Sequence, residues 1–244
     1  MEEAFSRRLA DLARRAWEQG VPCFTHFLDL EAQDALHRAL PALPPVPWRL
    51  FGGAEGCERV MLRLGDARDV PFPIVCLHVA PRSEKYGEAL THRDYLGALM
   101  ALGIERELLG DIAVRGKEAW LFCEERIAPY LQEPFTQARR TFLVCAPSAP
   151  PEGPLYETRP VRVQVSSQRA DALIARVFSM SRGDAQALFP AGKVFVNGRQ
   201  CESPGHTPRA GDIISVRGFG RFRYRGMESL SKKGKENTAV ELFV

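Results

Sequence analysis

The stretch 181-SRGDAQALFPAGKVFVNGR-199 contains the signals for a short helix followed directly by a β-hairpin. Ser181, with Asp184 three residues later, predicts a capped helix start. The residues after the helix alternate as those of a strand do, and Asn197-Gly198 is the strongest short hairpin signal. The stretch therefore predicts a small unit that mixes helix and sheet.

The sequence on both sides extends this pattern. Arg169 and Asp171 open a helix with an apolar stripe, and Gly211-Asp212-Ile213 leads into another strand. The order R-x-D, apolar helix, Ser-Arg, second helix, G-x-V-x-V-N-G and G-D-x-I resembles the S4 RNA-binding domain. That resemblance implies an S4 (α-L) RNA-binding fold for residues 159–244, with structured RNA as its ligand. Gln186 stands where the family frequently has Arg, a difference expected to weaken one phosphate contact.

The start of the second helix is the first candidate RNA surface. A helix start presents free backbone N–H groups and a positive dipole, both of which suit phosphate. Arg182 lies in that first turn, and Arg169 and Lys193 are expected to flank the same surface. Any one basic residue alone is more simply explained as a solvated charge, but the whole pattern favours RNA contact by Arg182 and Lys193.

The stretch 217-RGFGRFRYR-225 gives a second candidate surface. Its arginines alternate with Phe222 and Tyr224, so on a strand the arginines share one face and the aromatic rings share the other. With the rings against the core, the arginines form a basic stripe. The full set of predicted RNA-binding residues is Arg169, Ser181, Arg182, Lys193, Asn197, Arg217, Arg221, Arg223, Arg225, Lys232, Lys233 and Lys235.

The charge of the chain is unevenly distributed. The net charge of the 244 residues is only +3. From residue 151 onward there are 15 Lys and Arg against 9 Asp and Glu, whereas the preceding part has 18 against 21. A basic C-terminal part on a nearly neutral body indicates a module that binds a polyanion.

The remaining chain divides at proline-rich and glycine-rich breaks. We predict an α+β fold with an N-terminal α/β subdomain at 1–72, a middle module at 73–147, a linker at 148–158 and the S4 domain at 159–244. The 52-GGAEG-56 stretch lacks the G-K-[ST] ending of a phosphate loop, which favours a structural turn and leaves anion or RNA contact as the alternative.

The middle module reads as strand, helix, strand, strand, helix, strand, which is the order of a ferredoxin-like (βαββαβ) plait. A capping box at 91–94 opens its first helix, and Gly103 ends it. Trp120 and Phe122 lie two apart on one strand and face the same side. They are candidates for stacking on bases, although core packing is the favoured interpretation.

Four longer stretches resemble the YlmH family of bacterial S4-domain RNA-binding proteins. They are FTHFLDL at 24–30, GGAEGCER at 52–59, HRDYLGALMALGIERELLGDI at 92–112 and RGFGRF at 217–222. The resemblance implies a protein that binds ribosomal RNA of the large subunit, with transfer RNA as a second candidate partner. It also implies a role in ribosome-associated quality control, in which stalled nascent chains are rescued.

No catalytic constellation is recognisable in the sequence. The aspartate motif of pseudouridine synthases is absent, and the histidines show no metal-ligand spacing. We therefore predict a non-enzyme with no catalytic residue, metal, cofactor or small-molecule substrate. The alternative is an RNA-modifying enzyme that uses S4 for targeting and has an unrecognised active site in 1–147.

The sequence predicts a cytoplasmic protein that does not associate with a membrane. Its charged start is unlike a signal peptide, and no apolar run approaches the roughly 18 residues of a membrane span. The six cysteines form no C-x-x-C pair, so we expect buried free thiols in a reducing compartment.

Overall fold

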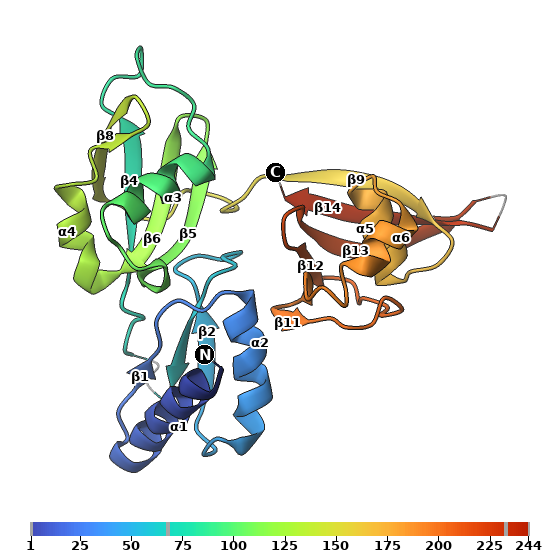
Figure 1. Ribbon diagram of the computed structural model, residues 1–244, viewed down its shortest axis with the longest axis horizontal. Coiled ribbons are helices and arrows are strands. Elements are labelled where there is room, and N and C mark those ends of the chain that lie inside the picture. Colours follow the sequence, from blue (N-terminus) through green and yellow to red (C-terminus); the bar gives the residue numbers. More distant parts are fainter. Residues whose placement is uncertain (1, 67–68, 232–233, 244) are drawn as a thin grey trace. The chain divides into compact units, whose positions relative to one another are not determined.

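The structure, a computed structural model, describes residues 2–66, 69–231 and 234–243. The chain forms two compact units, Met1–Tyr156 and Glu157–Val244. It is a mixed α+β protein with three sheets, and every strand pairing within the described residues is antiparallel (Figure 1). The domain boundaries that we expect at residues 72, 147 and 158 stay predictions.

The first part of unit 1 packs two helices against a three-stranded sheet of order β1-β3-β2. Its core contains Leu9 and Ala13 from the first helix, Leu36 from the second, and Leu62 and Leu64 from the sheet. The elements are α1 (Glu2–Gln19), β1 (Cys23–Phe24), α2 (Leu30–Ala39), η1 (Leu40–Ala42), β2 (Trp48–Phe51) and β3 (Met61–Leu64). The first helix thus buries the apolar stripe of an amphipathic sequence.

The glycines between β2 and β3 are required by close packing. Gly53 has φ +103°, and a Cβ there would collide with the ring of Phe122. A Cβ on Gly52 would collide with the side chain of Cys57 and the carbonyl of Arg59. Close packing therefore explains Gly52 and Gly53, which fits the interpretation of the 52–56 stretch as a structural turn.

The second part of unit 1 is a five-stranded sheet of order β5-β6-β4-β8-β7. The helices α3 and α4 pack against one face of this sheet. The hydrophobic cluster between them contains Leu77, Tyr95, Leu121 and Leu131. The elements are β4 (Ile74–Pro81), α3 (His92–Ala101), η2 (Arg106–Leu108), β5 (Leu109–Arg115), β6 (Glu118–Glu124), η3 (Glu125–Ile127), α4 (Ala128–Gln132), β7 (Gln137–Ala138) and β8 (Thr141–Pro147). The expected capping box at Thr91 and Asp94 is present.

The opposite face of this sheet is partly covered by other segments of unit 1. Phe122 is 0% exposed and packs in a cluster with Phe27, Met61 and Leu155. Phe122 cannot stack on a base while it is buried there. Trp120 is half-buried and lies 5.5 Å from the Arg115 guanidinium, so the favoured interpretation, core packing, fits both residues better than base stacking.

The end of the predicted linker packs on unit 1. Leu155 is buried, and the Tyr156 hydroxyl donates to Asp111 Oδ2 at 2.8 Å. Arg115 donates to the carbonyls of Glu152 and Pro154. These contacts fix the chain just before unit 2 begins.

Unit 2 is a six-stranded sheet of order β11-β10-β12-β13-β14-β9, with α5 and α6 over one face (Figure 1). The shared core contains Leu173, Ile174, Phe189, Phe222 and Val240. The elements are β9 (Thr158–Val165), α5 (Ala170–Val177), α6 (Arg182–Ala187), β10 (Val194–Val196), β11 (Arg199–Gln200), β12 (Ile213–Val216), β13 (Gly220–Leu230) and β14 (Glu236–Phe243). The predicted helix and hairpin of residues 181–199 are both present.

Two strands of unit 2, β9 and β14, do not correspond to any element that the sequence predicts. β14 lies between β13 and β9, and its Thr238 and Val240 point into the core. The sequence analysis had treated this region only as a source of tail lysines, because alternation in so short a segment is a weak signal. Lys232 and Lys233 lie outside the described residues, whereas Lys235 is exposed in the connection from β13 to β14.

All six cysteines are free thiols, and five of them are buried. Burial raises the pKa of the Cys76 and Cys123 thiols to about 12. These two cysteines therefore stay in the unreactive thiol form at neutral pH. None of the helices in the described residues has the length and apolar character needed to cross a membrane.

Candidate nucleic-acid interface

The two arginines of the helical surface are held by one buried carboxylate. Asp171, the second residue of α5, has a side chain with 0% exposure. It accepts hydrogen bonds from Arg169 Nε at 3.1 Å and Arg182 Nε at 3.2 Å. Asp171 therefore brings together two arginines that the sequence predicts to share a surface.

Asp171 is ionised at neutral pH. Burial alone would raise its pKa, but hydrogen bonds from Arg169, Gln186 and Arg182 outweigh burial and lower the pKa from 3.8 to about 2. The hydrogen bond that Arg169 donates to Asp171 in turn raises the pKa of Arg169. The side chains of Arg169 and Arg182 are 41% and 49% exposed, so the arrangement presents two oriented guanidinium groups to solvent.

Gln186 supplies the third donor to this carboxylate. Its Nε2 lies 2.7 Å from Asp171 Oδ2. The position where the family frequently has Arg is thus used here for a neutral hydrogen bond inside the cluster. Asp171 itself was quoted in the R-x-D pattern and could have been selected as a site residue from that signal.

Ser181 forms the cap of α6. Its hydroxyl accepts from the Asp184 N–H at 3.1 Å and donates to Asp184 Oδ2 at 2.6 Å. The cap that the sequence predicts is therefore present. The hydroxyl already makes two hydrogen bonds within the cap. Contact between Ser181 and RNA stays a prediction.

Three further predicted residues lie around the hairpin. Asn197 has φ 50°, donates to Asp212 Oδ1 at 2.7 Å and accepts from the Ile213 N–H at 2.9 Å. Its side chain therefore fixes the turn before β12. Lys193 is exposed, and its carbonyl accepts from the Arg217 N–H at 2.9 Å, which places the two residues side by side.

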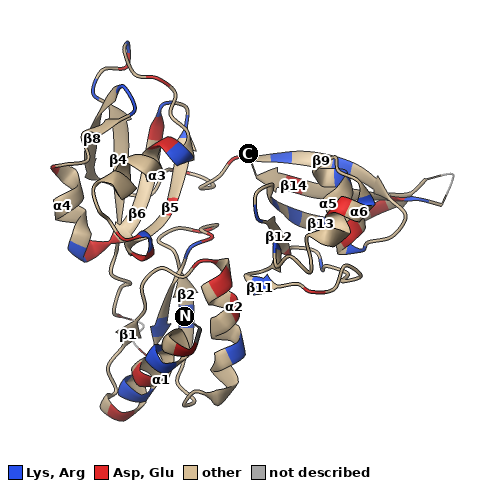
Figure 2. Cartoon of the chain, viewed as in Figure 1, with Lys and Arg blue, Asp and Glu red and all other residues tan. Residues whose placement is uncertain are grey.

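The basic stripe on β13 has the predicted alternation. Phe222 and Tyr224 are 0% and 5% exposed on the core side, so Arg221 and Arg223 face the other side of the sheet. Figure 2 shows Lys and Arg on β13 and on β9, which belong to the same sheet and are separated by β14. The sequence analysis thus assigned the two faces of this strand correctly.

The stripe is partly neutralised by β14, which the sequence analysis did not anticipate. Glu241 accepts from Arg225 at 2.8 Å and from Arg223 at 3.5 Å. The Arg221 guanidinium lies 4.5 Å from the centre of the Phe243 ring. Arg223 and Arg225 therefore contribute less free positive charge to the stripe than their number indicates.

The predicted residues occupy two faces of unit 2. Arg169 and Arg182 belong to the helices, which cover one face of the sheet, whereas the β13 arginines point from the other face. The structure therefore brings the arginines of each group together but does not join the two groups into one flat surface. None of these assignments to RNA is tested by the geometry alone, and they stay predictions.

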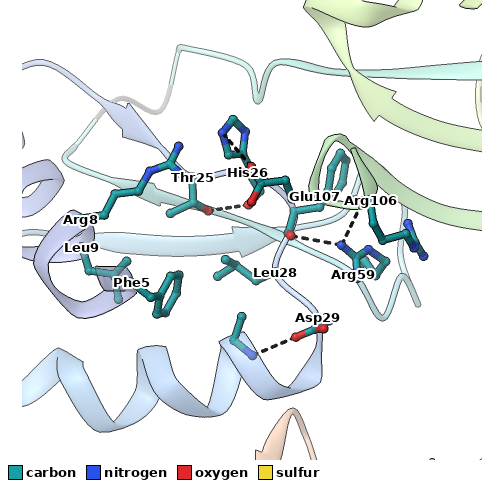
Figure 3. Close-up of a pocket in the computed structure, with 12 residues that line it drawn as sticks. Phe5, Arg8, Leu9, Thr25, His26, Leu28, Asp29, Arg59, Arg106 and Glu107 are labelled. Atoms are coloured by element: carbon teal, nitrogen blue, oxygen red, sulfur yellow. Dashed lines mark hydrogen bonds and ion pairs between the residues drawn. The ribbon is translucent and has the colours of Figure 1, made fainter. Parts of the chain in front are cut away.

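Unit 1 has a pocket of about 340 Å³ at the junction of its two parts, shown in Figure 3. It is lined by His26 and Asp29 from the 24–30 stretch, Arg59 from the 52–59 stretch, and Arg106 and Glu107 from the 92–112 stretch. Three stretches that carry the wider resemblance therefore meet at this pocket.

Arg59 ties these stretches together. Its guanidinium donates to the carbonyls of Leu109 at 2.9 Å, Arg106 at 3.1 Å and Phe27 at 3.3 Å. Its backbone N–H donates to Asp111 Oδ1 at 2.9 Å. Burial lowers the pKa of Arg59, and it lowers that of Arg106 to about 10. These contacts give the stretches a structural role.

Two histidines of unit 1, His26 and His78, lie beside acidic side chains. His26 interacts with Glu124 through Nδ1 and lies 3.7 Å from Glu107 through Nε2. His78 pairs with Glu118 at 3.0 Å, and burial lowers the pKa of His92. Over the described ranges, no group of three or more His, Cys, Asp or Glu is placed to hold a metal ion.

Comparisons with known proteins give one match over nearly the whole chain and one over its middle part. Residues 72–146 match the family model described as "Putative RNA-binding domain in YlmH". A Bacillus subtilis (strain 168) protein named ribosome-associated protein quality control protein P2 is 29% identical over 246 residues, which cover 98% of this chain and 95% of that one. A solved structure described as cell division protein ylmH from Streptococcus pneumoniae shows 22% identity and a TM-score of 0.48, covering 60% of this chain and 90% of its own.

The match over residues 72–146, beside a basic second unit, defines the chain as an RNA-binding protein. More narrowly, residues 72–146 match the RNA-binding domain of the YlmH family, and the four quoted stretches resemble that family. The family's RNA-binding domain coincides with the middle module of unit 1 and not with the surfaces described in unit 2.

Proposed function

We propose that this protein is a non-catalytic RNA-binding factor that binds ribosomal RNA of the large subunit and acts in ribosome-associated quality control. The observation that carries the RNA contact is the pair Arg169 and Arg182, oriented by a buried ionised carboxylate. The role in quality control rests on the name of the Bacillus subtilis relative, which aligns with 98% of this chain. Transfer RNA is a second candidate partner, and the cytoplasm is the compartment in which these partners occur.

The fold of each region supports a more specific part of this proposal. The order β5-β6-β4-β8, with α3 and α4 packed on one face, is the arrangement expected of a ferredoxin-like plait. In unit 2, α5 and α6 precede the β10–β11 hairpin, as the S4 pattern requires. We therefore propose a plait at 73–147 and an S4 domain at 159–244, separated by the linker 148–158 and preceded by the N-terminal subdomain 1–72.

The plait offers one exposed area that suits RNA. On β8, Phe142 and Val144 are 63% and 52% exposed on the face opposite α3 and α4. The Arg82 N–H donates to the Phe142 carbonyl at 2.8 Å, so the backbones of these two residues are adjacent. An aromatic ring beside an arginine can stack on an unpaired base, a role that the buried Phe122 cannot perform.

The test is cosedimentation of the full chain with purified large and small ribosomal subunits over a series of salt concentrations. Each neutralised phosphate releases counterion, so binding to large subunits should weaken steeply as salt rises. The variant Arg182→Ala/Lys193→Ala should bind more weakly and with a shallower dependence on salt. Equal binding of the wild type and this variant at low and high salt would refute the proposal.

Arg182 also supports Asp171, so loss of binding in that variant needs a folding control. Lys193→Ala alone removes a charge from an exposed side chain and should retain the wild-type melting temperature. Crosslinking in cells with sequencing of the bound RNA would then separate ribosomal, transfer and messenger RNA.

The competing hypothesis is an RNA-modifying enzyme with its active site in 1–147. A cofactor that copurifies with the protein, or a base modification lost when the gene is deleted, would favour this hypothesis. We do not include a cofactor, metal, membrane or small-molecule substrate in the proposed function.

A further inference from the structure

Unit 2 has a second basic feature that the sequence analysis did not identify as a site. A pocket of about 370 Å³ opens between the end of β9, the helices α5 and α6, and the start of β14. Arg176, Arg182 and Lys235 line it, together with the polar side chains of Gln164 and Ser166. Among the residues that the structure describes, no Asp or Glu lines this pocket.

The three cations reach the pocket from different segments. Arg176 is in the last turn of α5, Arg182 opens α6, and Lys235 immediately precedes β14. Each is exposed to solvent. Like charges that converge in one concavity repel one another and raise the local concentration of anions, so an anionic ligand would lower the energy of the arrangement.

Two of these cations are positioned by contacts of the fold. Arg182 donates through Nε to Asp171 Oδ2, which leaves its other N–H groups for a ligand. The Lys235 backbone exchanges hydrogen bonds with Ser231, through the hydroxyl at 2.9 Å and the N–H at 2.7 Å. These two bonds fix the backbone of Lys235 beside Ser231.

The rest of the lining suits a phosphodiester with its sugar. The Ser166 hydroxyl can donate to a phosphate oxygen, and Ala172, Ala175 and Met180 give an apolar wall. Guanidinium groups recognise phosphate oxygens through paired N–H donors, and a lysine adds a point charge.

We propose that this pocket binds a backbone phosphate of the RNA, with Arg176 and Lys235 as ligands beside Arg182. The proposal rests on the proposed RNA-binding function and deepens it by assigning a phosphate site on the helical side of unit 2. It gives Lys235 a defined contact and adds Arg176, which the S4 pattern did not select. The basic stripe of β13 is a separate surface.

The salt dependence of binding measures the number of phosphates contacted. We expect the Arg176→Ala/Lys235→Ala variant of the full chain to bind large-subunit ribosomal RNA with a log–log salt slope shallower than the wild type by about 0.7 to 0.9, the value of one phosphate. Arg209→Ala is the matched control, since Arg209 is an exposed arginine of the same unit outside the pocket. Its slope should equal that of the wild type.

The outcomes separate the two proposals. A wild-type chain that binds no RNA at any salt concentration overturns both the function and the phosphate site. A wild type that binds, together with a folded double variant of unchanged slope, overturns the phosphate site alone. Circular dichroism melting establishes whether the double variant is folded.

Footprinting with an amine-reactive reagent gives a second measurement that needs no substitution. Large-subunit RNA should slow the modification of Lys235. An unchanged rate at Lys235 in a chain that binds RNA would contradict the site. If inorganic phosphate at equal ionic strength protects Lys235 as well as RNA does, the pocket binds a free anion and the assignment to RNA is overturned.

Discussion

Asp171 carries a charge although its side chain has no exposed surface, because three side chains donate hydrogen bonds to it. Asp171→Asn keeps the shape but removes the charge that the arginines share. Arg169 and Arg182 are 41% and 49% exposed, so solvent screens both pairs and we expect a loss of only roughly 1 to 2 kcal/mol in the stability of unit 2. Urea unfolding followed by far-ultraviolet circular dichroism measures this loss.

RNA binding should weaken in the same variant because both guanidinium groups lose their orientation. The control is Glu202→Gln, which makes the same change of charge at an exposed position. If Asp171→Asn and Glu202→Gln affect stability and binding equally, Asp171 does not organise the surface.

The lowered pKa of Asp171 predicts how the stability of unit 2 depends on pH. The pKa of Asp171 is about 2 in the fold against an ordinary 3.8. A lowered pKa means that the ionised carboxylate stabilises the fold above pH 3.8, and that this contribution is lost as the pH falls towards 2. The difference in stability between the wild type and Asp171→Asn should be constant down to pH 3.8 and then narrow. A difference that grows below pH 3.8 would contradict the lowered pKa of Asp171.

At the scale of elements, Arg59 joins the β2–β3 connection to the 24–30 stretch, to η2 and to the start of β5, with one carbonyl group in each. Arg59→Lys keeps the charge but cannot make these bonds together, because an ammonium group lacks the planar fork of donors. We expect unit 1 to lose roughly 2 to 3 kcal/mol of stability. Arg49→Lys, at an exposed position of β2, is the control and should be nearly neutral.

The pairing of β13 with β14 predicts a gain of RNA affinity. Glu241 neutralises Arg223 and Arg225, so Glu241→Gln should release both arginines for RNA. An exposed ion pair contributes roughly 0.2 to 1 kcal/mol, and we therefore expect a gain of between about 1.5-fold and 5-fold. Filter binding at low salt measures it. Glu202→Gln changes the total charge equally, and an equal gain there would show that only net charge matters.

The elements of unit 2 could be predicted where a strong local signal exists. Ser181 and Asp184 fix a helix start, and Asn197-Gly198 fixes a hairpin, because caps and turns depend on a few neighbouring residues. β14 was missed because its place between β13 and β9 depends on long-range pairing. For the same reason the sequence did not reveal that Glu241 would lie beside the arginine stripe.

The candidate site was predictable as a set of residues but not as a geometry. The S4 pattern selected Arg169 and Arg182, and the structure brings both to Asp171. The pocket residue Arg176 was not selected, since only the packing of α5 beside β14 shows that it and Lys235 line one cavity. Separation of the helical and sheet arginines likewise follows from the fold.

For the whole molecule, the division into two compact units predicts two unfolding transitions. The units have their own hydrophobic clusters, and all three tryptophans, Trp17, Trp48 and Trp120, belong to unit 1. Tryptophan fluorescence therefore reports on unit 1, whereas circular dichroism reports on both units.

The two stability variants test this division. Arg59→Lys should lower the urea midpoint of the fluorescence transition, because its carbonyl partners are all in unit 1. Asp171→Asn should leave that midpoint unchanged and should shift only the part of the circular dichroism signal that comes from unit 2. Were Asp171→Asn to move the fluorescence midpoint as far as Arg59→Lys does, the chain would unfold as one cooperative body, and a charge change at the RNA surface would be transmitted to the RNA-binding domain at 72–146.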